Sequence, residues 1–447
     1  MKPISPPPDS AKLLLSNPQQ IIELLLTGGA KDLLQHSNEK YLHWHDFRFR
    51  PMPKGLTPEM GWALLKISRL AQIKRLGFKG IDGTDFGYWL PDAIQRGLHF
   101  IDQNATGQIL IDEPAIGPGE RDRYIFNSLM EEAIASSILE GAATTRTKAK
   151  QMLREERKPR NRGEQMVLNN YRTMRKIKEL SGHELSIQML CELQASMTAG
   201  TLDDESAAGR FRRADEEVQV VDMMDGSILH TPPPAEELDR RIKLLCRFAN
   251  ETPELSFMHP VVKAIILHFW LAYEHPFVDG NGRTARALFY WFLLKQKYWL
   301  MEFLPISRII LKAPSKYMRA FQFTETDAGD LTYFISFNVR ALRLAIEELK
   351  LYMLNKQREL KQAKSQLHKF PGLNHRQVEI VQHALRHPDA TYTIRRHMNI
   401  HSVVYQTART DLFDLEKKGF FTTMKRGRTY LFLPADDLTK KLKLIKR

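Results

Sequence analysis

The spacing of apolar residues predicts a chain that is helical through its middle and different at both ends. From Glu120 to about Met353, apolar residues recur at intervals of three and four, the spacing of one face of a helix. Before this part, a proline-rich start leads into a short amphipathic segment, Gln19 to Leu34. The passage from Gly87 to Leu110 has the pattern of mixed loop and strand. The prediction is a mainly α protein.

Two stretches break the helical pattern with β-like residues. Glu217 to Asp222 is the first, and Asp225-Gly226 follows it as a turn signal, which predicts a short hairpin inserted among helices. In the second stretch, Phe421 to Met424 and Thr429 to Phe432 flank a basic turn. Three helical segments precede it: Gln377 to His387, Thr393 to Asn399 and Val403 to Lys418. Three helices followed by a basic hairpin predict a winged helix-turn-helix.

These patterns divide the chain into four parts. We expect an N-terminal region, residues 1–118, to pack on a helical bundle domain of residues 119–353, which contains the hairpin. A helical connector, residues 354–370, then leads to the winged helix-turn-helix of residues 371–447. The break at Gly117-Pro118-Gly119 marks the first boundary, because glycine and proline interrupt regular structure.

Composition favours a globular protein of a reducing compartment. The chain is 43% hydrophobic, yet its apolar runs are too short to cross a bilayer, and no signal-peptide core follows Met1. The two cysteines, Cys191 and Cys246, lie in apolar helix-like patterns and are expected to be buried thiols. We therefore expect a cytoplasmic protein with no membrane partner. The sequence leaves the oligomeric state open, a homodimer included.

Three neighbouring histidines raise the alternative of a metal site near the N-terminus. His36, His43 and His45 lie close together in the sequence, but no fourth ligand follows at a suitable spacing. Trp44 and Phe47 in the same stretch have the character of core residues. The favoured interpretation is a packed aromatic region without a metal.

Positive charge is concentrated at the C-terminal end. The net charge is +14, and residues 371–447 hold 15 Lys and Arg against 7 Asp and Glu, a net of +8. Such an excess is typical of nucleic-acid partners, although it also occurs on solubilising surfaces. In a winged helix, Val403 to Lys418 would be the recognition helix and the hairpin turn the wing. The candidate DNA contacts are Tyr405, Gln406, Arg409, Lys425, Arg426 and Arg428. Protein docking or dimerisation by this domain stays open.

The segment His275-Pro-Phe-Val-Asp-Gly-Asn-Gly-Arg-Thr-Ala-Arg286 carries the candidate chemistry. It joins two apolar helical segments, His259 to Glu274 and Thr284 to Lys295, which would hold it rigidly. Its glycines let the backbone approach a ligand, and a helix N-terminus favours phosphate. Arg283 and Arg286 suit a polyphosphate, Asp279 suits Mg²⁺, and His275 can accept a proton near neutral pH.

This segment resembles the signature of the Fic family at all of its fixed positions. Met258-His-Pro-Val261 and His268 precede it as in the family, and Ile228-Leu-His-Thr-Pro-Pro233 resembles the end of the family's flap. The resemblance implies a Fic-type helical bundle that transfers AMP from ATP, with Mg²⁺, to a Ser, Thr or Tyr hydroxyl of a protein, itself included. Gly282 favours AMP transfer over the phosphotransfer of relatives with Lys there, whereas phosphocholine transfer stays open.

The resemblance also implies a role for each site residue. His275 would be the general base, and Asp279 would hold Mg²⁺ between the α- and β-phosphates. The hairpin from Val218 to Ile228 would be the flap that orients the target hydroxyl. Tyr317 would line the adenine side, although Met318 and Ala313 depart from the family pattern and a core tyrosine is the alternative. The implied nucleotide contacts are Glu140, His230, Gly280, Asn281, Gly282, Arg283, Thr284, Ala285, Arg286 and Tyr317.

A second motif resembles the family's inhibitory helix. Ser136-Ser-Ile-Leu-Glu140-Gly lies at the end of a helical segment, residues 121–141, on the N-terminal side of the signature. The resemblance implies that Glu140, with Ser136, pairs with Arg286 and keeps it from the γ-phosphate. The alternative is an ordinary helix-terminal carboxylate. In some relatives the same glutamate also supports AMP removal, and this additional role stays open. A different class of function also stays open, a DNA-binding transcriptional regulator whose Fic domain senses nucleotide.

Overall fold

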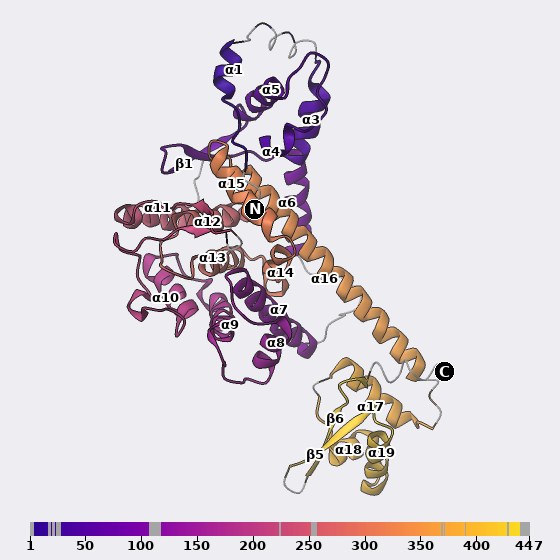
Figure 1. Ribbon diagram of the computed structural model, residues 1–447. Helices are drawn as coiled ribbons and strands as arrows, with labels where there is room; N and C mark the ends of the chain where they lie inside the picture. The colour runs from indigo at the N-terminus through magenta and orange to yellow at the C-terminus, as the bar shows by residue number, and fades with distance from the viewer. Residues whose placement is uncertain are drawn as a thin grey trace. The chain divides into compact units, whose positions relative to one another are not determined.

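The computed structural model describes residues 4–16, 19, 23, 28–106, 118–222, 225–251, 257–367, 370, 372–388, 390–426 and 429–438, and Figure 1 shows their arrangement. Backbone contacts group the chain into two units. The first, which we call unit 1, comprises Met1–Gln108 and Ser128–Ile346, and the second, unit 2, comprises Ile109–Asn127 and Glu347–Arg447. Two long helices, α7 (Pro118–Leu139) and α16 (Thr332–Leu367), each contribute residues to both units.

The N-terminal part of unit 1 is a small helical layer. Its elements are α1 (Ser10–Ser16), α3 (Lys31–Lys40), α4 (Trp44–Phe47), α5 (Pro58–Leu70), β1 (Lys74–Lys79), β2 (Asp85–Tyr88) and α6 (Asp92–Ala105). Trp44 and Phe47 are buried beside Trp62, so they are core residues as predicted. Tyr41 donates from its hydroxyl to Asp330 at 2.6 Å, which ties this layer to the helices that follow. Within the described residues no group of His, Cys, Asp and Glu could hold a metal ion.

The prediction for Gly87 to Leu110 is wrong over most of its length. Strand β2 ends at Tyr88, and the chain then forms the helix α6 instead of mixed loop and strand. Gly97 weakens the helical signal in the sequence, but a Cβ there would meet Val339 Cγ1 of α16 at 2.5 Å, so the close packing requires glycine. The buried face of α6 follows three- and four-residue spacing: Ile94, Leu98, Ile101 and Ala105. Residues 107–110 lie outside the described ranges.

The remainder of unit 1 is a helical bundle built around two adjacent helices. These are α12 (Pro260–Glu274) and α13 (Asn281–Lys295), which are buried along most of their length because both are apolar on nearly every face. Around them lie α7, α8 (Arg146–Arg154), α9 (Arg162–Leu180), α10 (Ile187–Thr198), η1 (Glu205–Ala207), η2 (Ala235–Glu237), α11 (Leu238–Asn250), η3 (Trp299–Phe303), α14 (Ile306–Leu311), α15 (Pro314–Thr326) and the first part of α16. The predicted mainly helical fold is confirmed.

The predicted inserted hairpin is also present. Strands β3 (Val220–Val221) and β4 (Ile228–His230) pair antiparallel, with Val220 opposite His230 and Val221 opposite Ile228. Asp222 donates its N–H to Ser227 O at 2.8 Å across the hairpin. Residues 223–224 are outside the described part of the chain.

Unit 2 contains a compact core of its own. After the end of α16, its elements are α17 (His375–Arg386), α18 (Ile394–His401), α19 (Tyr405–Lys417), β5 (Phe421–Arg426) and β6 (Thr429–Pro434). Residues from each helix and from the hairpin share one apolar cluster, which includes Val381, Ile394, Leu412 and Phe432. The order of helices and hairpin agrees with the predicted order, and the winged helix-turn-helix stays a prediction.

The predicted cysteine environments are partly confirmed. Cys246 is buried and Cys191 is partly buried, and both are free thiols. Burial raises the pKa of both thiols, so both are inert as nucleophiles near neutral pH. Among the described helices, none combines the length and the apolar character needed to cross a membrane.

Candidate active site

The predicted catalytic segment forms a tight loop between the two central helices. Helix α12 ends at Glu274, and the residue that follows it, His275, adopts the left-handed conformation with φ 46° and ψ 54°. Helix α13 begins after Gly280, whose φ of 85° also requires the left-handed region. A Cβ at Gly280 would meet Thr198 Cγ2 at 2.9 Å. Both the backbone conformation and the lack of space for a side chain therefore favour glycine at this position. The loop therefore brings His275 and the N-terminus of α13 close together.

Asn281 closes the loop from inside. Its Oδ1 accepts from Phe277 N at 2.9 Å, and its Nδ2 donates to Phe277 O at 2.7 Å. The Phe277 ring is fully buried, as expected of an anchor in the core. The side-chain amide of Asn281 thus finds both of these hydrogen-bond partners within the loop, and the two bonds fix the conformation of the loop backbone.

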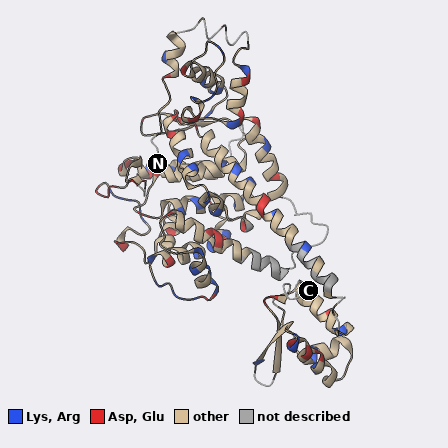
Figure 2. Cartoon of the chain, turned by 45° about the vertical axis from the view of Figure 1, so that its right-hand side comes forward, with Lys and Arg blue, Asp and Glu red and all other residues tan. Residues whose placement is uncertain are grey.

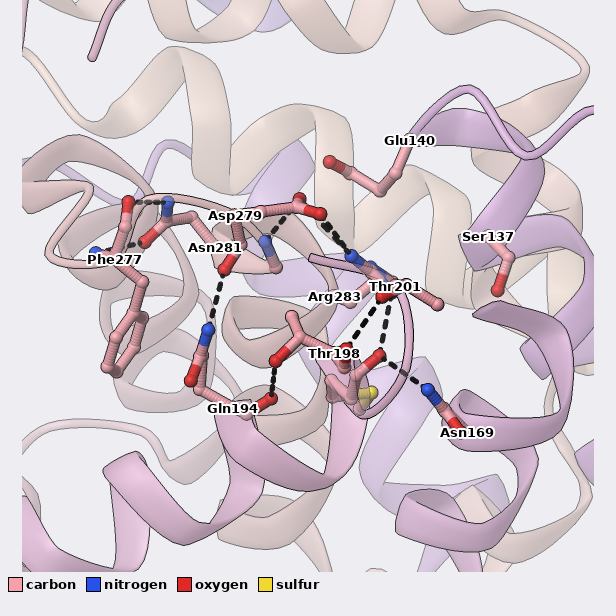
Figure 3. A network of polar contacts seen from close by, with 12 residues as sticks. Ser137, Glu140, Asn169, Gln194, Thr198, Thr201, Phe277, Asp279, Asn281 and Arg283 are labelled. Carbon is pink, nitrogen blue, oxygen red and sulfur yellow. Dashed lines mark hydrogen bonds and ion pairs between the residues drawn. The ribbon is translucent and has the colours of Figure 1, made fainter. Parts of the chain in front are cut away.

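Helix α10 supports the loop from below, as Figure 3 shows. Gln194 donates from Nε2 to Asp279 O at 3.0 Å and accepts from Gly209 N at 2.7 Å. Arg283 donates from Nη1 to Met197 O at 2.8 Å, at the end of the same helix. These contacts fix both the acidic residue and the first arginine of the signature.

Asp279 and Arg283 form an ion pair at the start of α13. Arg283 Nη2 lies 3.2 Å from each carboxylate oxygen of Asp279, whose side chain is 35% exposed. Arg283 is fully buried, so much of its predicted capacity for phosphate is committed to Asp279 and α10 in this structure. Its Nε and the Oγ1 of Thr284 are buried polar atoms without a hydrogen-bond partner among the described residues.

His275 is arranged as a neutral base. Its Nδ1 lies 3.2 Å from Ala272 O, and because a carbonyl only accepts, Nδ1 carries the proton. The lone pair is then on Nε2. Burial, aided by the positive charge of His230, lowers the pKa of His275 to about 4. The ring is therefore unprotonated at neutral pH, as a general base must be.

Arg286 and the end of α7 meet as the inhibitory motif predicts. Arg286 donates from Nε to Ser136 Oγ and from Nη2 to Ser136 O, each at 2.9 Å. Its Nη2 also lies 2.9 Å from Glu140 Oε1. Glu140 follows the last helical residue, Leu139, so the helix is shorter at this end than the predicted 121–141. The guanidinium is almost fully buried and has its charge balanced by Glu140.

Glu140 also occupies the space in front of α13. A Cβ built on Gly282 would meet Glu140 Oε1 at 2.2 Å, so the carboxylate lies directly against the backbone of the first helical turn. This is where N–H groups and the helix dipole favour an anion. Figure 3 shows Glu140 pointing toward the side of the loop that carries Asp279.

Two other predicted site residues are engaged with protein groups. His230 lies at the end of β4, and both of its ring nitrogens are hydrogen-bonded, to Glu325 Oε2 and to Tyr273 O, each at 2.7 Å. Tyr317 is buried, and its hydroxyl lies 2.8 Å from His268 Nε2. This environment agrees with the alternative that Tyr317 is a core residue. Ala285 is fully buried in the first turns of α13.

Sequence reasoning missed Arg212, which ties the loop to the flap. Its N–H donates to Pro276 O at 2.8 Å, its Nε donates to His275 O at 3.0 Å, and its Nη2 makes a short bond to Pro233 O. These acceptors lie far from Arg212 in the sequence, and no local pattern marks them. The contacts hold His275 in its left-handed conformation, which costs about 1–3 kcal/mol when unsupported.

The helical bundle, the glycine-rich loop and the flap together are similar to a Fic domain. A model of the Fic/DOC family matches residues 184–293, which include the flap and the whole catalytic loop. Ser136, Glu140 and Tyr317 lie outside that match. The chain is distantly related to curated proteins named protein adenylyltransferase Fic.

The related proteins are similar over limited segments. The relative from Nematostella vectensis is 29% identical over 141 residues, which are 31% of this chain and 29% of that protein. The relative from Drosophila ananassae is 39% identical over 69 residues, 15% of this chain and 14% of that protein. The chain thus spans less than a third of the length of these curated relatives.

A solved structure shares the fold over a larger part of the chain. It is a Fic family protein from Desulfovibrio desulfuricans G20, with a TM-score of 0.53 and 19% identity. The similarity covers 77% of this chain and 97% of that one. At this identity the comparison shows a common Fic fold.

Proposed function

We propose that this chain is a protein adenylyltransferase that transfers AMP from ATP to a Ser, Thr or Tyr hydroxyl of a protein, itself included. The observation that carries the proposal is the loop from His275 to Arg286, which sets a neutral imidazole beside the N-terminus of α13. A base and an anion site on one rigid loop are what nucleotidyl transfer to a hydroxyl requires.

The residues present fit ATP and Mg²⁺. Gly280 and Gly282 leave the backbone of the first turn of α13 open to a phosphate, once Glu140 is elsewhere. Asp279 has a partly exposed carboxylate, the oxygen ligand that Mg²⁺ prefers beside phosphates. Buried Arg283 Nε and Thr284 Oγ1 still lack partners within the described contacts. Bound Mg²⁺ would neutralise phosphate charge during transfer.

The reaction forms one bond and breaks one at the α-phosphorus. The target oxygen attacks this phosphorus as His275 Nε2 takes the hydroxyl proton, and the bond to the β-phosphate oxygen breaks. Pyrophosphate leaves with that electron pair, and the target carries AMP. The N–H groups at the start of α13 and the guanidinium of Arg286 would stabilise the phosphate charges.

In the same proposal Glu140 restrains the resting enzyme. Arg286 is held by Ser136 and Glu140, and the Glu140 carboxylate lies against Gly282. A γ-phosphate would need the same guanidinium, and two anions cannot share it without repulsion. Removal of Glu140 should therefore allow productive binding of ATP.

The test compares single variants of the full chain with labelled ATP and Mg²⁺. Glu140→Gly should raise incorporation of AMP into the chain itself and into lysate proteins by about tenfold or more, equivalent to about 1.4 kcal/mol of barrier. His275→Ala in that background should lower it by about 100-fold or more, since a general base is lost. Glu155→Gly, which changes the carboxylate that follows α8, is the matched control. An inactive Glu140→Gly protein with normal ATP binding would contradict the proposal.

A second candidate function is DNA binding by unit 2. The exposed face of α18 and α19 carries Arg395, Arg396 and Arg409, and Figure 2 marks the basic positions of this unit. Of its acidic residues, Asp411 is buried and pairs with Arg376 at 2.7 Å, whereas Glu379, Asp436 and Asp437 are exposed. Exposed cations on these two helices suit a phosphate backbone.

Of the predicted DNA contacts, several are exposed and two lie beyond what the structure describes. Tyr405, Gln406 and Arg409 are exposed on α19, and Lys425 is exposed on β5. The side chain of Arg426 and the whole of Arg428 are outside the described residues. The exposed set supports the proposed interface, with α19 as the element that reads bases.

Fluorescence anisotropy with a labelled duplex tests this interface in the full chain. Arg409→Ala should weaken binding by about tenfold, in line with about 1–3 kcal/mol for a lost base or phosphate contact, and binding should weaken as salt rises. Lys54→Ala, an equal charge change in unit 1, should leave the affinity unchanged. If both variants bind equally well, α19 is not the interface and protein docking becomes the better account.

A further inference from the structure

The flap hairpin is joined to the catalytic helices through one histidine. His230 ends strand β4, and its Nε2 lies 2.7 Å from Tyr273 O, in the last turn of α12 and two residues before His275. Its Nδ1 lies 2.7 Å from Glu325 Oε2 on α15. The ring also packs against the Tyr273 ring at 4.8 Å between centroids. One side chain thus links the flap to two different helices.

The two partners require His230 to be an imidazolium. A carbonyl and a carboxylate both accept, so each ring nitrogen must donate a proton. Burial opposes this charge, but the bond to Glu325 and its negative charge raise the pKa of His230 above its ordinary value. The other ionisable groups that face the ring are Glu274 and His275 of α12. Glu274 is neutralised by Arg241 at 2.6 Å, which leaves Glu325 as the main counter-ion.

The hairpin itself is short and largely exposed. Its strands are two and three residues long, and Val221 and Ile228 are 46% and 56% exposed. A two-stranded hairpin is marginally stable without further contacts. The segment that follows β4 has a second tie, the bond from Arg212 to Pro233 O. Within the described contacts, His230 is the strand residue that binds both α12 and α15.

We propose that Glu325 is a positioning residue, which acts through His230 to hold the flap hairpin at a fixed place beside His275. The inference rests on the proposed function, in which the hairpin orients the target hydroxyl for attack. Glu325 lies on α15, outside both the catalytic loop and the flap. Its effect should therefore appear in the use of the protein target and not in the binding of nucleotide.

The experiment uses the full chain with Glu140→Gly as the active background. Glu325→Gln keeps the shape of the side chain and an acceptor oxygen but removes the charge. Glu217→Gln removes an equal charge from an exposed position just before the flap and is the matched control. Four quantities are measured: auto-AMPylation rate, Mg·ATP affinity by calorimetry, the pH profile of the rate, and hydrogen exchange of the Val220, Val221 and Asp222 amides.

For Glu325→Gln we expect auto-AMPylation to fall by about tenfold or more while Mg·ATP affinity stays within about twofold, the pattern of lost orientation. The amides of the hairpin should exchange faster. Without Glu325 the imidazolium loses its counter-ion, so as pH rises the rate should decline from a lower pH than in the background protein. Glu217→Gln should change none of these quantities.

Two results would overturn the inference. One is a Glu325→Gln protein with unchanged rate and unchanged exchange of the hairpin amides. The other is a parallel loss of Mg·ATP affinity and rate, which is expected if Glu325 only supports the fold. If the Glu140→Gly background transfers no AMP, the proposed function itself fails. Unchanged hydrogen exchange of the hairpin amides in Glu325→Gln would then also reject the positioning role of Glu325. Faster hydrogen exchange of these amides would retain Glu325 as the residue that holds the hairpin in place.

Discussion

At the scale of single residues, the candidate site depends on groups whose charge is set by their neighbours. His275 is kept neutral by burial, and His230 is kept positive by Glu325 and the Tyr273 carbonyl. Arg286 is buried with its charge balanced by Glu140. The proposed base, the histidine that binds the flap and the proposed phosphate-binding arginine therefore keep distinct charge states within one small region.

The pKa of His275 makes a direct prediction for pH dependence. The unprotonated ring is the active form, and its pKa is lowered to about 4, so the base is available from neutral pH down to that value. The negative charge of Glu140 raises this pKa, so in the Glu140→Gly protein at limiting Mg·ATP, which reports the free enzyme, AMP transfer should persist as pH falls through the ordinary histidine range and be lost no earlier than about 4. Circular dichroism at each pH checks that the chain stays folded. A loss centred near the ordinary histidine value would show that His275 is not desolvated.

Arg212 gives a second prediction at this scale. Arg212→Lys cannot serve both His275 O and Pro233 O with one ammonium group. The lost bonds should lower the free energy of unfolding by about 1–3 kcal/mol, as for other buried unsatisfied acceptors, and slow AMP transfer. Urea denaturation and the labelled-ATP assay measure the two effects. Arg213→Lys, at the exposed neighbouring position, should be close to neutral.

The residues that the sequence points to lie in short motifs, chiefly the loop from His275 to Arg286 and the Ser136–Glu140 motif. His275, Asp279 and Arg286 could be identified because their spacing is a signature with a chemical reason for each position. Arg212, Gln194 and Glu325 could not, because each acts across a long sequence separation on a carbonyl or on another side chain. Such contacts depend on the folded path of the chain, which periodicity does not determine.

At the scale of elements, the end of helix α7 is fixed by its neighbours. Gly141 follows Glu140 with φ 82°, so the chain turns sharply away after the inhibitory residue. Glu131 of α7 accepts from Arg146 and Lys150 of α8 at 2.6–2.7 Å. The strength of the helical pattern made α7 predictable, but Gly97 concealed α6, because close packing against α16 requires a residue that helices otherwise disfavour.

A substitution at Gly163 on α9 would test how firmly the end of α7 is held in place. A Cβ at Gly163 would meet Ala143 N at 2.7 Å, so Gly163→Ala must displace the backbone just beyond the inhibitory motif. The free energy of unfolding should fall by about 1–3 kcal/mol, as for other overpacked sites, and the rate of AMP transfer should rise in part. Thermal unfolding and the labelled-ATP assay measure them. Gly182→Ala has open space and is the control. A loss of stability with no rise in AMP transfer would mean that inhibition by Glu140 does not depend on the position of Ala143.

At the scale of the whole molecule, two units have separate apolar clusters. The cluster of unit 2 is formed by α16, α17, α18, α19 and the β5–β6 hairpin, and the catalytic loop belongs wholly to unit 1. Charge distribution indicated a separate C-terminal domain, but it could not reveal that α7 and α16 contribute to both units. Continuous helices carry no sequence signal at the point where their packing partners change.

Separate cores predict separable effects on stability. Leu412→Ala removes a fully buried side chain from the cluster of unit 2 and should cost about 2–5 kcal/mol there. Calorimetry of the full chain should then show a lowered transition for unit 2, while Mg·ATP affinity stays unchanged. Leu351→Ala, at an exposed position on α16, is the control. A single transition that moves as a whole would show that the units unfold together.

The contact between Glu140 and Gly282 has a consequence for how such proteins diverge. The carboxylate takes the volume that any side chain at position 282 would fill. With this backbone, a larger residue at 282 and a glutamate at 140 in its present rotamer exclude each other. Inheritance at the two positions should therefore be linked: lineages that acquire a side chain at 282 must lose or reorient the glutamate, and an alignment of homologues should show this covariation.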